Sequence, residues 1–117
     1  MEQLCRDWTL VEADDLLGVA PTDVSSGVLT DQRRRSSHQV DVVARAGDRV
    51  VALGDVKLGE RLGLPHIARL REVRDLLGQR GRDARLLLFP GRPGNVDPAV
   101  LADPDVDVVE PRQLFAG

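Results

Sequence analysis

The sequence predicts an α/β protein in which helices cover both faces of a mixed central sheet of about four to five strands. Two valine-rich segments, residues 39–45 and 49–57, flank a short turn and indicate a hairpin. The apolar run 84–89 ends at a Pro-Gly pair, which is typical of a strand buried on both faces. A helical pattern separates this run from the hairpin and favours a parallel crossover between them.

The remaining elements follow from periodicity and from residues that start or stop helices. Leu4, Trp8 and Val11 share one helical stripe, and Gly18 can end that helix. Asp97 followed by Pro98 predicts the start of a single helical turn. In chain order we expect a helix at 1–17, strands at 26–30, 39–45 and 49–57, a helix at 66–78, a strand at 84–89, a helical turn at 97–102, a strand at 107–109 and a turn at 111–115.

Composition limits the class of protein. The 117 residues suit one domain, and 42% hydrophobic with 30% charged residues argues against a disordered chain. A single cysteine, Cys5, excludes an internal disulfide and fits a reducing compartment. No signal peptide is visible and no apolar run approaches the roughly 20 residues of a membrane span, so we expect a cytoplasmic protein without membrane contact. The net charge of −3 does not favour non-specific nucleic-acid binding.

The basic residues are almost all arginine. The sixteen lysines and arginines include only one lysine, Lys57, which lies two residues after Asp55. Three arginines are adjacent at residues 33–35 in the polar link before the hairpin, where they could contact phosphates or form a solvated loop. Arg69, Arg71 and Arg74 lie mostly off the apolar stripe of the second helix. With Glu72 and Asp75 interspersed, they are expected to form a solvated face laced with salt bridges.

The hairpin contains the residues with the clearest chemical signal. If residues 46–48 form a three-residue loop, Arg45 lies opposite Arg49 and Asp41 lies opposite Leu53. Asp41, Asp55 and Lys57 then converge on one face, whereas a two-residue loop would separate the two aspartates. The three-residue loop is favoured because it leaves the other face uncharged. That face would carry Val40, Val42, Ala44, Val50, Ala52, Gly54 and Val56.

A cluster of two carboxylates and one amine can serve metal-assisted phosphate chemistry. Asp41, Asp55 and the Val56 carbonyl could supply oxygen ligands to Mg²⁺ (or Mn²⁺), which keeps several waters in its shell. Lys57 leaves the strand on the same face as Asp55 and could orient a water or stabilise charge on a phosphate. The alternative is a surface salt bridge between Lys57 and an aspartate, worth less than about 1 kcal/mol.

These residues resemble a known signature. Asp41, then a hairpin, then Asp55-Val56-Lys57 resembles the bipartite motif of the PD-(D/E)XK nuclease-like superfamily. MEQLCRDW, HQVDVVA and LGDVKLGE are similar, over roughly residues 1–89, to the C-terminal domain of unknown function of archaeal-type P-loop ATPases. The resemblance implies a restriction-endonuclease-like sandwich with Asp41 and Asp55 as metal ligands and Lys57 as the catalytic amine. It also implies that Glu2, on the first helix, completes the acidic site.

Two functional hypotheses follow. The first is a Mg²⁺-dependent nuclease domain that hydrolyses DNA phosphodiesters. The second is a catalytically inactive accessory or protein-interaction domain that partners a P-loop ATPase module in cis or in trans. In either case we expect one domain over residues 1–117, either independent or the C-terminal fragment of a larger ATPase. Residues 54–61 have the glycine spacing of a Walker A motif, but Glu60-Arg61 replaces its Lys-Ser/Thr, so this chain alone is not expected to bind ATP.

Overall fold

The computed structural model describes residues 1–115 and has an α/β architecture with a five-stranded mixed sheet. The strands run antiparallel from β1 to β3, and β4 and β5 then add in parallel. The expected α/β fold with a mixed sheet is therefore confirmed. The elements are α1 (Glu2–Glu12), α2 (Asp14–Leu17), β1 (Asp23–Asp31), β2 (Ser36–Ala46), β3 (Arg49–Lys57), α3 (Leu64–Leu77), η1 (Gly78–Gly81), β4 (Arg85–Pro90), η2 (Pro98–Ala102), β5 (Val106–Val108) and α4 (Pro111–Leu114).

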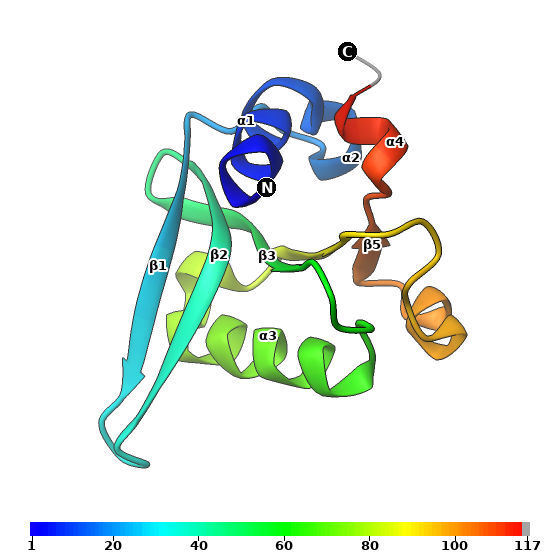
Figure 1. Ribbon diagram of the computed structural model, residues 1–117. Helices are drawn as coiled ribbons and strands as arrows, with labels where there is room; N and C mark the ends of the chain where they lie inside the picture. Colours follow the sequence, from blue (N-terminus) through cyan, green and yellow to red (C-terminus); the bar gives the residue numbers. More distant parts are fainter. Residues whose placement is uncertain (116–117) are drawn as a thin grey trace.

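Helices lie on both faces of the sheet (Figure 1): α3 is on one side, and α1, α2 and α4 are on the other. Each face has its own apolar core. Leu86 and Leu88 of β4 belong to the cluster that includes α3, and Leu87 and Phe89 belong to the cluster that includes α1. This alternation explains the continuous apolar run, because both faces of β4 are buried. No helix among residues 1–115 is long and apolar enough to cross a membrane.

The largest departures from the expected elements lie in the first helix and in the first strand pair. The first helix is interrupted at the buried Ala13, whose dihedral angles (φ −92°, ψ 4°) leave the helical region, so two helices replace one. The first strand pair is also longer than expected. The Asp31 carboxylate accepts hydrogen bonds from the backbone N–H groups of Arg33 (3.0 Å) and Arg34 (3.3 Å). This aspartate-stabilised turn shortens the expected polar link to residues 32–35.

The β2–β3 turn corrects the predicted register. Ala46 pairs with Arg49, so only Gly47 and Asp48 form the loop, and the three-residue loop is wrong. Gly47 has a φ of 65°, which glycine adopts without the steric cost that other residues incur. Leu53 consequently lies opposite Val43, not opposite Asp41.

The predicted common face of the two aspartates nevertheless survives, because a bulge offsets the shorter loop. Ala44 pairs with Ala52 while Arg45 pairs with Val50, so Val51 is an extra residue in β3. The register beyond the bulge pairs Val42 with Gly54. One further step in this register places Asp41 beside Asp55.

A second bulge lies at Asp41 itself. Ser25 pairs with Val43 and Gly27 pairs with Val40, so Asp41 and Val42 together face the single residue Ser26. Bulges bend a strand and redirect its side chains, often beside functional sites. The two bulges also explain why Val40 and Val50 pack in the cluster with α3, not on the expected face with Val42.

Gly54 is a sensitive position in this core. A Cβ at residue 54 would lie 3.0 Å from Phe89 Cε2 and 3.0 Å from Val42 Cβ. We expect Gly54→Ala to lower the free energy of unfolding by about 1–3 kcal/mol through overpacking. Gly59→Ala is the control, because a Cβ there would meet nothing within 4 Å. Urea unfolding of both variants tests this expectation, and equal stabilities would contradict it.

Candidate functional site

Asp41 is held between the hairpin and the first helix. Its carboxylate Oδ2 accepts a hydrogen bond from the Val56 N–H at 2.9 Å. Its backbone carbonyl accepts a hydrogen bond from Arg6 Nη1 at 3.0 Å, so α1 contacts the same bulge. These bonds fix the Asp41 carboxylate at the end of the hairpin, against the residue that follows Asp55.

Asp55 is the unusual residue of this group. Its side chain is 1% exposed, and neither carboxylate oxygen has a hydrogen-bond donor among residues 1–115. Lys57 Nζ and Arg69 Nη2 lie 3.9 and 3.7 Å from Asp55 Oδ1, too far for hydrogen bonds. Buried carboxylates without donors are costly and therefore rare. A hard divalent cation, which binds carboxylate oxygens, would satisfy them, so the donor set fits Mg²⁺ or Mn²⁺.

Electrostatics reinforce this interpretation. Burial raises the pKa of the Asp55 carboxyl to about 6, and the nearby Asp41 carboxyl contributes to the rise. The positive charges of Lys57 and Arg69 act in the opposite direction and lower the pKa. Two ionised carboxylates cannot hydrogen-bond to each other because neither carries a proton. A shared proton or a bound cation would relieve this pair.

A pocket of ≈ 300 Å³ is lined by Lys57, Glu60, Pro65, His66 and Arg69, of which Lys57 and Arg69 lie within 4 Å of Asp55. Lys57 links the two regions, since Nζ is 3.9 Å from Asp55 Oδ1 and 4.0 Å from Glu60 Oε2. His66 Nδ1 accepts a hydrogen bond from the Gly63 N–H at 2.9 Å, at the start of α3. A neutral His66 therefore carries its proton on Nε2, which lies 3.5 Å from Glu60 Oε1.

The structure brings together Asp41, Asp55 and Lys57 but gives the other two predicted residues different surroundings. Glu2 is exposed in the first turn of α1. No three His, Cys, Asp or Glu side chains within residues 1–115 form a group that could hold a metal ion, so Glu2 does not join the two aspartates in such a group. Val56 contributes its N–H to Asp41, and its carbonyl as a metal ligand remains a prediction.

Sequence reasoning misread Arg69. Its guanidinium is not simply solvated, because Nη2 donates to the Gln39 carbonyl at 3.0 Å and lies 3.7 Å from Asp55. The other two arginines of α3 form the expected salt bridges, but their partners are Asp103 and Asp105 and not the acidic residues of the helix itself. Arg71 pairs with Asp103, and Arg74 donates to the Ala84 carbonyl at 3.2 Å. The helix that connects the hairpin to a parallel strand must pack on one face of the sheet. This requirement could have indicated that Arg69 lies near the end of β3.

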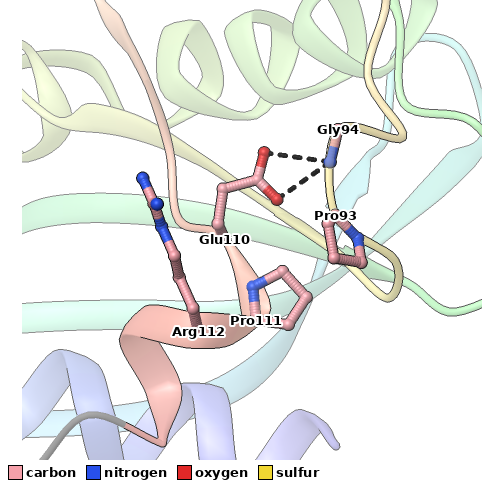
Figure 2. A pocket seen from close by; sticks show the side chains of 5 residues that line it. All are labelled: Pro93, Gly94, Glu110, Pro111 and Arg112. Carbon is pink, nitrogen blue, oxygen red and sulfur yellow. Dashed lines mark hydrogen bonds between the residues drawn. The ribbon is translucent and has the colours of Figure 1, made fainter.

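A second pocket lies elsewhere, at the turn before α4 (Figure 2). It measures ≈ 260 Å³ and contains none of the predicted site residues. Both carboxylate oxygens of Glu110 accept hydrogen bonds from the Gly94 N–H, at 3.3 and 3.1 Å, and Figure 2 shows this contact between the two segments. Since the Glu110 carboxylate already has a donor and two prolines line the pocket, we assign a structural role to this pocket.

The pKa of Asp55 predicts a pH-dependent stability. The folded-state pKa of about 6 exceeds the ordinary value of 3.8, so the folded protein binds the Asp55 proton more tightly than the unfolded chain does. The resulting contribution to the free energy of unfolding is complete below about pH 4 and is lost as the pH rises through about 6. In metal-free buffer the Asp55 contribution should fall by roughly 3 kcal/mol between about pH 4 and 7, since each pKa unit corresponds to about 1.4 kcal/mol.

Replacing the carboxylate tests this expectation. We expect Asp55→Asn to flatten the dependence and to be more stable than the wild type at neutral pH, because an amide carries no charge and can donate to Asp41. Asp15→Asn, at an exposed position on α2, is the matched control. Urea unfolding with EDTA across this pH range measures the effect, and parallel pH profiles for all three proteins would refute it.

No family model matches the chain, and no curated protein or solved structure is significantly similar to it. The resemblance to the nuclease-like superfamily therefore depends on the Asp41 and Asp55-Val56-Lys57 motif and on the short segments around it. Their geometry is the basis for a functional proposal.

Proposed function

We propose that the chain is a metal-dependent nuclease-like domain of the restriction-endonuclease-like type that hydrolyses DNA phosphodiesters. The observation that carries the proposal is the buried Asp55 carboxylate, which has no hydrogen-bond donor among residues 1–115 and lies beside Asp41 and Lys57. The order of elements also supports it, since a helix precedes three antiparallel strands and a second helix leads to a parallel strand.

Asp41 and Asp55 would hold the metal ion, with the Val56 carbonyl as the proposed third protein ligand. When bound, Mg²⁺ or Mn²⁺ supplies a Lewis acid for a phosphoryl oxygen and lowers the pKa of a bound water. One oxygen of Asp41 is already engaged by the Val56 N–H, which orients the carboxylate. Orienting contacts of this kind improve the precision of a metal site.

Lys57 is the residue placed to meet the substrate. Its side chain is 29% exposed, so it can contact both the buried Asp55 and a ligand in the adjoining pocket. Its two carboxylate partners lie at 3.9 and 4.0 Å, so its ammonium N–H donors remain available for a phosphate oxygen. Arg69, anchored through the Gln39 carbonyl, adds a second positive charge that offsets the two carboxylates as a phosphodiester approaches.

One observation favours a second function, a non-catalytic accessory domain that contacts an ATPase module. The Arg69 guanidinium lies 3.7 Å from Asp55 Oδ1 and provides an internal counter-ion for this carboxylate. A protein that uses Arg69 in this way would need no metal. Metal binding therefore separates the two functions.

Calorimetric titration with Mg²⁺ and Mn²⁺ tests the metal site. We expect the wild type to bind with a heat that Asp41→Ala abolishes, because this change removes one of two carboxylate ligands. Asp15→Ala removes an exposed carboxylate and should bind like the wild type. Equal heats for wild type and Asp41→Ala would remove the nuclease function and leave the accessory domain.

Cleavage of plasmid DNA tests the chemistry. We expect metal-dependent cleavage by the wild type and a loss of at least about a hundredfold in Lys57→Ala, within the usual range for a group that acts on the transferring atoms. Lys57→Arg keeps the positive charge while changing its geometry, so partial activity would identify charge as the main contribution of Lys57. Cleavage that persists unchanged in Lys57→Ala would argue against its catalytic role.

A further inference from the structure

The first two strands extend beyond the rest of the sheet. β3 pairs with β2 only from Val42 onward, so residues 27–31 and 36–40 pair only with each other. Figure 1 shows this two-stranded ribbon running past α3 to a free end. We call the part formed by residues 26–40 the β1–β2 ribbon. The ribbon continues beyond the end of the β2–β3 pairing, so contacts with the rest of the sheet do not explain its length.

The two faces of the β1–β2 ribbon differ. The inner face is braced by α3: Arg69 donates to the Gln39 carbonyl, and His38 Nε2 lies 3.6 Å from Glu72 Oε2. The outer face has no charged side chain. It carries the exposed residues Ser26, Val28, Thr30, Ser37 and Gln39.

The tip of the β1–β2 ribbon is strongly basic. Residues 32–40 include three arginines and no acidic residue. The nearby Asp31 carboxylate is partly occupied by the backbone N–H groups of the turn and is 16% exposed. Arg34 has carboxylate partners in Asp31 (3.9 Å) and Glu72 (3.6 Å). Within residues 1–115, Arg33 and Arg35 form no ion pair, so their charges are available to a ligand.

Arg35 also has an unusual backbone conformation. Its φ of 53° lies in the left-handed region, and it is the only residue other than glycine with a positive φ in the described part of the chain. Glycine or asparagine would adopt this conformation more easily. The conformation of the turn therefore gives no reason for an arginine at this position, and the charge of its side chain is the property left to explain.

We propose that the β1–β2 ribbon binds the phosphate backbone of duplex DNA, with Arg33 and Arg35 as its main contacts. The inference rests on the proposed function and identifies a substrate-binding surface for it. Arginine, serine, threonine and glutamine side chains are the usual partners of DNA phosphates, and a two-stranded ribbon fits a DNA groove. Duplex DNA is favoured over a single strand, because residues 23–46 contain no Phe, Tyr or Trp on which unpaired bases could stack.

The distance to the candidate site suits this role. The five residue-to-residue steps from Ser36 to Asp41 span about 17 Å along β2, at about 3.4 Å per step. This corresponds to about five base-pair steps of 3.4 Å each. A duplex held at the tip can therefore extend alongside the hairpin that carries Asp41.

The test measures DNA binding separately from cleavage. Fluorescence anisotropy with a duplex of about 20 base pairs, in EDTA so that no metal is available for cleavage, gives the affinity between about 50 and 200 mM salt. We expect the triple change of Arg33, Arg34 and Arg35 to Ala to weaken binding and to reduce the slope of log K against log salt by about two units, near 0.9 for each phosphate that the protein no longer neutralises. Arg34→Ala alone should have a smaller effect than Arg33→Ala.

Arg35→Gly separates binding from folding. It removes the charge and relieves the left-handed backbone, so we expect weaker DNA binding with an unchanged or raised Tm. The matched control is the triple change of Arg49, Arg80 and Arg82 to Ala. These three arginines line a pocket between the β2–β3 turn and the η1 segment that precedes β4, at the opposite end of β2 from the ribbon tip. Their replacement removes the same charge and should leave most of the binding intact.

The outcomes distinguish the two proposals. Equal weakening by both triple variants would show that net charge alone governs binding and would overturn the ribbon inference, as would unchanged binding by the ribbon variant. Absence of duplex binding by the otherwise unchanged protein in EDTA would also overturn it. Ribbon-dependent binding by a protein that takes up no metal and cuts no DNA would uphold the ribbon inference while refuting the nuclease function.

Discussion

The site depends on the hydrogen bond from the Val56 N–H to the Asp41 carboxylate. This bond joins the bulge of β2 to the end of β3 and keeps the two aspartates together although their strands curve apart beyond this point. Val56 also pairs in parallel with Phe89, so the same strand segment is anchored in the buried part of the sheet. The position of Asp41 is thereby determined by a rigid element, which a metal or phosphate site requires.

The balance of charge around Asp55 is the second constraint. Two carboxylates and two cationic side chains, Lys57 and Arg69, lie together before any ligand arrives. A divalent cation and a phosphodiester carry charges of opposite sign, so binding both together would change the net charge of this group of side chains only slightly. The cations, however, stay beyond hydrogen-bonding distance from Asp55. The carboxylate is therefore partly neutralised while its oxygens remain free to bind a ligand.

The sequence was sufficient for the α/β class, the approximate elements and the common face of Asp41 and Asp55. It did not reveal the turn length and the bulge that bring the two aspartates to that face. The two-residue turn would have separated the aspartates, but the extra residue Val51 restored the alternation. Bulges of this kind leave little trace in a pattern of valines, because either register buries apolar side chains. Arg69 was misread since helical periodicity describes one helix alone and does not show which strand end lies beneath it.

The order of the strands in the sheet is the same as their order in the chain. Each strand thus joins a neighbour that has already been synthesised, and three of the five form a meander with short local connections. Local connections close quickly, whereas the crossover through α3 requires a longer and slower closure. Asp55 pairs with Leu88 of β4, and its neighbour Arg69 belongs to α3, so we expect its carboxylate to be enclosed only after this crossover has closed. The dehydration of its carboxylate is therefore expected late in folding, where it would oppose the final docking of β4 and hasten the reverse step, especially in alkaline solution.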